Sequence, residues 1–249
     1  MKKMIVMGIA LSLLVSPPAA RAEDAAGAGS FSAAFASRYV WRGQVLSEGV
    51  VAQPTVGVTL GGFCANLWSN VDLDNGEEDD DGIVMNETDL TLSYTMAVGP
   101  VSVTGGIAHY DTESTDTQEI FLTCAAKTLL NPSLSLYYDI DDGKGGFAVL
   151  AVSQGFPAGP LSLTAGASVG FNLGDKAMGL NADGKDFTGL YYGEVSLATS
   201  IPLFGNVTLD PRIAYSTALG DDGKYAIEAI SVDGKKDMFY ASVAITAAF

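Results

Sequence analysis

The chain has 249 residues, of which 48% are hydrophobic, and its 29 acidic and 13 basic side chains give a formal net charge of −16. Nucleic-acid binding is excluded because it depends on Lys and Arg contacts to phosphate, which so acidic a surface repels. A disordered acidic protein is excluded by the large hydrophobic share.

The first element is an export signal over residues 1–22. Lys2 and Lys3 precede an apolar run over residues 4–15, and Ala20-Arg21-Ala22 provides a small-x-small cleavage site. A membrane anchor would need about 20 apolar residues, and this run is shorter. Cleavage after Ala22 leaves one domain, residues 23–249. It removes three basic residues, so 10 basic and 29 acidic side chains remain, a charge of −19.

The rest of the chain alternates between apolar and small or polar residues. In residues 239–249, for example, Phe239, Val243 and Ile245 fall on one face, while Ser242 and Thr246 fall on the other. A period of two predicts a strand with one apolar face. Runs of about ten residues, the length that crosses a bilayer as a tilted strand, recur roughly twelve times. They begin near Phe31, Val50, Gly62, Thr88, Val101, Gln118, Ser133, Gly146, Leu161, Leu190, Val207 and Met238.

The links between these runs alternate in length. Short turns fall at Gly61, Gly99-Pro100, Asn131-Pro132, 157–160 and 204–206. Polar loops lie between them, at Arg42–Gly49, Asp72–Asn86, Asp111–Thr117, Asp139–Gly145, Asn172–Asp186 and Gly220–Asp237. This arrangement predicts an all-β fold, a closed antiparallel transmembrane barrel with short periplasmic turns, longer external loops and both termini periplasmic. A soluble β-sandwich also alternates, but its loops have no reason to segregate by length.

Aromatic residues near strand ends are expected to form girdles at the membrane interfaces. A packed interior is the alternative role for such large side chains. The residues concerned are Tyr39, Trp41, Trp68, Tyr110, Phe171, Tyr191, Phe239 and Phe249.

Two segments resemble known outer-membrane barrels. The terminal Phe249 on an alternating strand resembles the C-terminal signal through which many such barrels engage the barrel assembly machinery. The segment 31–43, with Ser37-Arg38-Tyr39-Val40-Trp41-Arg42-Gly43, then Ser47, Pro54 and Leu67-Trp68-Ser69-Asn70-Val71, resembles the opening of the TorF-type porin family of proteobacteria. The close resemblance covers about residues 31–75 and implies an outer-membrane, porin-like protein without naming its solute.

Charged and polar residues on the inner faces are the candidate channel lining, because Arg facing lipid at mid-membrane costs about 2–4 kcal/mol. They are Arg38, Arg42, Gln53, Asn66, Trp68, Asp89, Glu194, Asp210 and Arg212. One interpretation is a water-filled pore that filters solutes by charge. The other is a filled lumen in which Arg38, Arg212, Asp210 and Glu194 pair with one another; twelve strands lie between filled and open barrels in size.

The acidic run Asp72–Asp81 does not have the spacing of an EF-hand, and like-charge runs are usually solvated, so we assign no metal site; weak divalent bridging to lipopolysaccharide is the milder hypothesis. His109 is the single histidine and is expected on the lipid side, where a barrel lipase would need a Ser partner. Nothing marks that partner by spacing.

Cys64 and Cys124 fall on the third and sixth predicted strands. Three strand spacings are about 14 Å, too far for a disulfide, so we expect free thiols. Pro54 and Pro211 lie inside predicted strands, and each requires a strand end or bulge because proline cannot donate to the ladder.

The sequence therefore predicts a passive outer-membrane channel for small polar solutes, in contact with outer-membrane lipid and lipopolysaccharide. No catalytic residue and no cofactor is indicated. A barrel enzyme acting on lipid, and a closed structural or adhesive barrel, are the alternatives.

Overall fold

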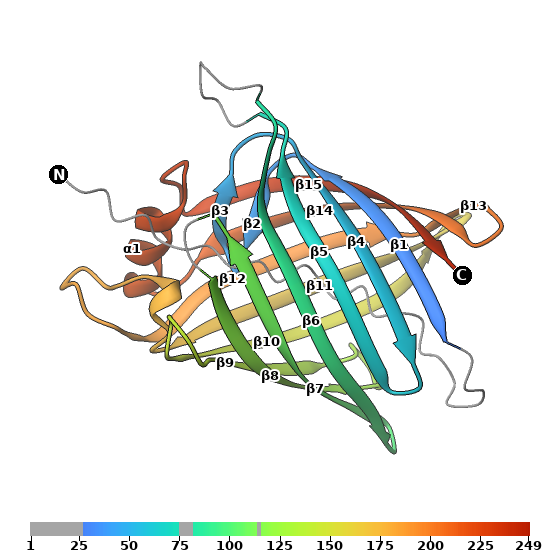
Figure 1. Cartoon of the computed structure of the whole chain (residues 1–249), viewed down its shortest axis with the longest axis horizontal. Helices are drawn as coiled ribbons and strands as arrows, with labels where there is room; N and C mark the ends of the chain where they lie inside the picture. The colour runs from blue at the N-terminus through green and yellow to red at the C-terminus, as the bar shows by residue number, and fades with distance from the viewer. Residues whose placement is uncertain (1–26, 75–81, 114–115) are drawn as a thin grey trace.

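A computed structural model of the chain describes residues 27–74, 82–113 and 116–249 (Figure 1). The export signal and most of the acidic run Asp72–Asp81 lie outside the described residues, so their predicted roles stay predictions. Among the described residues, no helix has the length and apolar character needed to cross a membrane.

The strands close into a twelve-stranded antiparallel barrel, which confirms the predicted fold class. Each barrel strand pairs with the next one along the chain, and β1 pairs with β15, which closes the ring. The bounds are β1 Ala28–Ala36, β4 Val51–Leu60, β5 Phe63–Asp72, β6 Val84–Val98, β7 Val101–Thr112, β8 Asp116–Ala126, β9 Ser133–Asp139, β10 Gly146–Ala158, β11 Leu161–Leu173, β12 Thr188–Thr199, β14 Val207–Ala218 and β15 Asp237–Ala248. A further strand, β13 (Ile201–Phe204), pairs with β14 and continues the line of β12.

Pro54 and Pro211, the two prolines predicted inside strands, lie where one ladder is interrupted. The β12–β14 pairs end at Ala198↔Arg212 and the β13–β14 pairs resume at Ile201↔Leu209, leaving Pro211 unpaired on that side. Pro54 lies in the same kind of gap, between the pairs Ala52↔Val71 and Thr55↔Trp68 of β4 and β5. Each proline still pairs on its other side, so a gap in one ladder, rather than a strand end or a bulge, accommodates the missing donor.

The alternation along the strands separates two faces of the wall. Val58 and Leu92 point outward with 55% and 48% of their surface exposed, as do many Leu, Val and Phe side chains around the barrel. Small polar side chains, such as Thr123 and Ser135, which are hydrogen-bonded to each other, occupy the inner face. An apolar outer face and a polar inner face are what a bilayer-spanning barrel requires.

The two ends of the barrel differ. At the turn end, four connections are two residues long (61–62, 99–100, 159–160 and 205–206), and β1 and β15 meet there with Ser30 opposite Ala248. The loop end carries longer segments, including η1 (Lys176–Met178) and the helix α1 (Asp221–Ile230).

Three loop predictions were wrong in detail. The loop expected over Asp111–Thr117 shrinks to 113–115, because β7 and β8 extend until Asp111 pairs with Asp116. The loop Gly220–Asp237 contains α1, whose buried Ala226, Ile227 and Ile230 pack inward. The first strand ends at Ala36, and residues 38–49 leave the wall, since Ser37 and Val50 still bond to the backbone of Ala241 and Leu73.

Cys64 and Cys124 are free thiols, as predicted. They lie on β5 and β8, with two strands between them. Strand parity places Cys64 on the same face as the buried Trp68, which is the inner face. Cys124 shares the outer face with the exposed Leu122.

Candidate functional site: the barrel interior

A hairpin occupies the interior near the loop end. It consists of β2 (Tyr39–Trp41) and β3 (Gln44–Ser47), which pair only with each other; we call residues 39–47 the inner hairpin. Its turn residues Arg42 and Gly43 both have positive φ, 44° and 83°, as in a type I′ turn. A side chain at Gly43 would meet Cβ of Tyr192 at 2.6 Å, so glycine is required for close packing as well as for conformation.

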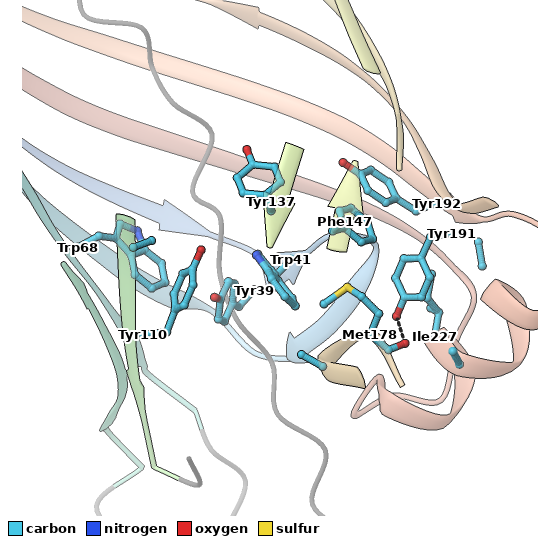
Figure 2. Packing of buried hydrophobic residues seen from close by; sticks show 14 of the residues in the cluster. Tyr39, Trp41, Trp68, Tyr110, Tyr137, Phe147, Met178, Tyr191, Tyr192 and Ile227 are labelled. Atoms are coloured by element: carbon cyan, nitrogen blue, oxygen red, sulfur yellow. Dashed lines mark hydrogen bonds between the residues drawn. The ribbon is translucent and has the colours of Figure 1, made fainter. Parts of the chain in front are cut away.

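Aromatic side chains fill the bore around the inner hairpin (Figure 2). Tyr39 contacts Trp68 of β5, with ring centroids 5.6 Å apart. A bulge in β12, where Gly170 pairs with Tyr192 and Phe171 with Leu190, turns both Tyr191 and Tyr192 inward. We call the part of the bore around the inner hairpin the filled section. The aromatic residues that fill it include Tyr39, Trp41, Trp68, Tyr110, Tyr137, Phe147, Tyr191 and Tyr192.

The girdle prediction is therefore wrong for five residues, namely Tyr39, Trp41, Trp68, Tyr110 and Tyr191, all of which are buried. Tyr39 and Trp41 belong to the inner hairpin itself, and this hairpin provides an interior surface on which Trp68, Tyr110 and Tyr191 pack. Phe239 and Phe249 remain on the outside, 61% and 78% exposed.

Arg42 lies at the centre of this filled section. Its Nη1 and Nη2 donate to the two carboxylate oxygens of Glu119 at 2.8 and 2.7 Å. The guanidinium carbon lies 4.5, 4.6 and 4.5 Å from the ring centroids of Trp41, Tyr137 and Phe147. Arg42 is 6% exposed and Glu119 is fully buried, so this bidentate pair lies in a medium that strengthens charge–charge attraction.

A second carboxylate, Asp175, approaches Arg42 from the segment after β11. Its Oδ1 accepts from the backbone N–H of Ala177 at 2.9 Å and so caps η1, and Oδ2 lies 3.9 Å from Nη1 of Arg42. Oδ2 accepts no hydrogen bond from the described residues. Burial raises the pKa of Asp175 to about 7, although the Arg42 charge opposes that rise.

Polar contacts anchor the rest of the inner hairpin. The Tyr39 hydroxyl donates to Glu87 at 3.0 Å, and Gln44 donates to the Tyr191 hydroxyl at 2.9 Å. The Val45 backbone bonds both to Ser231 Oγ and to the Val232 N–H, at 3.1 and 2.9 Å. These bonds connect the hairpin to strands on several sides and to the segment after α1.

The turn-end half of the bore is polar and less tightly filled. Arg212 on β14 donates to Glu194 on β12 at 2.5 Å, and Tyr240 on β15 donates to the other oxygen of Glu194 at 2.6 Å. Asp210 accepts from Ser200, Thr208 and Thr246 at 2.5, 2.9 and 2.8 Å. The side chains of Arg212 and Glu194 keep 13% and 14% of their surface exposed.

The nine predicted lining residues divide into three groups. Arg42, Trp68 and Asp89 are buried in the filled section. Gln53, which donates to Asn70 at 3.0 Å, and Asn66, Glu194, Asp210 and Arg212 are partly exposed on inner faces. Arg38 leaves the wall and pairs with Asp233 of the loop end at 3.1 Å.

Of the pairings expected for a filled lumen, only that between Arg212 and Glu194 occurs. Arg38 is kept from the other three because the strand ends before it. Asp210 is satisfied by hydroxyl groups instead. The lining role itself stays a prediction.

Sequence reasoning missed Glu119 and Asp175. Glu119 could have been found, since it lies in the strand predicted from near Gln118 and alternates with the apolar Ile120 and Leu122. Asp175 carried no comparable signal, because a residue in an irregular segment has no periodicity from which to infer its direction.

His109 lies on β7 with Leu90 and Gln118 as its cross-strand neighbours. Neither neighbour is a nucleophile, so these pairs do not supply the Ser partner that a barrel lipase needs.

Comparison with known proteins reveals the fold but no family. No protein-family profile matches the chain, and no curated protein matches it. The COG4313 outer membrane channel from Pseudomonas putida F1 is 11% identical, with a TM-score of 0.51 over 90% of this chain and 96% of that one. The NanC porin is also 11% identical, with a TM-score of 0.48 over 88% and 98%. Outer membrane phospholipase A from Escherichia coli is 13% identical, with a TM-score of 0.41 over 89% and 88%. At these identities the likeness concerns the fold alone, which is a closed antiparallel β-barrel.

Proposed function

We propose that the protein is an outer-membrane channel for the passive diffusion of small polar solutes, narrowed by the inner hairpin. One observation carries the proposal. Charged and hydroxyl side chains, with Arg212, Glu194 and Asp210 among them, face a partly exposed bore within a wall whose outer face is apolar. Channels use such groups to select solutes.

The location follows from the same chemistry. We infer that residues 1–22 direct export, that the apolar wall contacts outer-membrane lipid, and that the longer loops face outward beside lipopolysaccharide. Insertion by the barrel assembly machinery through the strand ending in Phe249, and membership of the TorF-type porin family, are parts of this proposal that rest on resemblance.

Planar-bilayer recording of the mature protein tests the channel. The comparison is with a variant in which residues 39–47 are replaced by a short Gly-Ser link, since Ala36 and Val51 pair directly and hold the wall without the hairpin. We expect small or infrequent current steps from the natural chain and larger, sustained steps from the variant. If both proteins insert and neither conducts, the channel is wrong and the closed structural barrel takes its place.

The lipid-hydrolysing alternative is measured on the same preparations. Release of fatty acid from phospholipid vesicles that is lost on His109→Ala would support it. We expect no release from either protein.

A further inference from the structure

The environment of Arg42 has the composition of a binding site for a guanidinium group. Glu119 presents both carboxylate oxygens to the fork of donors, and three aromatic faces surround the guanidinium carbon at 4.5–4.6 Å. A planar cation between a bidentate carboxylate and π faces gains charge-assisted hydrogen bonds and cation–π attraction together. The site is assembled from β8, β9 and β10, with Trp41 as the contribution of the hairpin itself.

The site carries more negative charge than Arg42 neutralises. Asp175 is 1% exposed, and its Oδ2 faces Arg42 from 3.9 Å without accepting a hydrogen bond from the described residues. When both carboxylates are ionised, they and one guanidinium leave one negative charge in the site. Because Asp175 Oδ2 is directed at the place that the Arg42 guanidinium occupies, that place suits a cation able to reach both Glu119 and Asp175.

Arg42 is presented to this site in the manner of a tethered ligand. It occupies the tip of a hairpin that shares no ladder with the wall. Its backbone is in the left-handed conformation, which is unusual for a residue other than glycine. We propose that the Glu119–Asp175 site binds small solutes bearing a guanidinium group, which displace Arg42 and loosen the tip of the inner hairpin. The opening of the channel that should follow from this displacement rests on the proposed channel function. The binding of the solute can be measured independently of that function.

The first experiment uses Arg42→Ala in detergent, with unfolding followed by heat-modifiable migration. The variant should be less stable than the natural chain, because it leaves Glu119 buried without its cation. Guanidinium chloride at about 10 mM, far below the molar concentrations that denature proteins, should restore stability. Urea, which is planar and uncharged, and methylammonium, which lacks the fork of donors, should not.

Arg212→Ala is the matched control. It removes the same residue type from a carboxylate, Glu194, that is partly exposed. Arg212 faces a single ring, with its guanidinium carbon 5.3 Å from the ring centroid of Tyr240. Equal restoration of both variants by guanidinium, or restoration of Arg42→Ala by methylammonium as well, would overturn the site. If Arg42→Ala does not fold, Arg42→Met keeps the side-chain volume without the charge and is tested in the same way.

The second experiment records the natural chain in a bilayer. Methylguanidinium at about 10 mM should raise the open fraction at least about tenfold over the same concentration of methylammonium, consistent with a preference of about 1.4 kcal/mol. An unchanged open fraction in a conducting channel would overturn displacement of Arg42. If no preparation conducts, the channel fails, while the stability measurement still decides the site.

Discussion

At the scale of single residues, the unusual choice is to bury two carboxylates beside one arginine. Glu119 is satisfied by Arg42 and by the Tyr110 hydroxyl, which donates to it at 3.0 Å. Asp175 is less well compensated, because its Oδ2 stands 3.9 Å from the nearest guanidinium nitrogen. Removing one partner of a buried pair costs more than the pair contributes, since a charge is then left in a dry medium.

Asp175 makes the loop end sensitive to pH. Because burial raises its pKa from 3.8 to about 7, the folded state binds a proton that the unfolded state has released between those values. The folded state therefore gains stability as pH falls from 8 toward 4, with Arg42, Glu119 and Asp139 as the charged neighbours. We expect Asp175→Asn to be the more stable protein at pH 8, by on the order of 1 kcal/mol.

Urea unfolding in lipid vesicles at pH 5 and pH 8 measures this difference, with Asp183→Asn in the same loop as the exposed control. A natural chain whose stability is equal at the two pH values, or a variant that keeps the full dependence, would contradict the assignment to Asp175.

Gly43 is a residue-scale test of the hairpin turn. Gly43 and Gly61 both have positive φ, 83° and 58°, but only an added Cβ at Gly43 would meet Tyr192, whereas at Gly61 nothing lies within 4 Å. Both alanine variants should lose about 1 kcal/mol from backbone strain. Gly43→Ala should in addition raise the open fraction in a bilayer, and Gly61→Ala should not. Identical recordings from the two variants would mean that the close contact does not hold the hairpin in place.

At the scale of elements, the sequence predicted what depends on periodicity. All twelve strands, with starts within about four residues, and the inward side of Glu194 and Arg212 follow from alternation, which the membrane imposes on every strand. The inner hairpin could not be found this way: Tyr39 and Trp41 continue the period-two pattern of the first strand, yet the wall ends at Ala36. The helix α1 was missed for a related reason, since two Asp, a Gly and a Lys in its first turn suggest a polar loop.

At the scale of the whole molecule, the two cysteines test whether the turn-end half of the bore holds water. Cys64 lies on the inner face opposite Thr59 and Ser93 near the turn end, and Cys124 lies on the outer face opposite Val103 and Leu134. In lipid vesicles, a small charged thiol reagent should label Cys64 and spare Cys124. Mass spectrometry of the Cys64→Ser and Cys124→Ser variants identifies the site. Labelling confined to Cys124 would show that the turn-end half is dry.

The direct pairing of Ala36 with Val51 also bears on how such a protein can change over evolutionary time. The wall closes without the fourteen residues between these two, so insertions, deletions or exchanges there leave every register of the barrel as it was. Selection on solute preference can therefore act on one short cassette, while selection on membrane insertion acts on the strands. Transplanting a foreign segment between Ala36 and Val51 is then a practical route to barrels with new permeability.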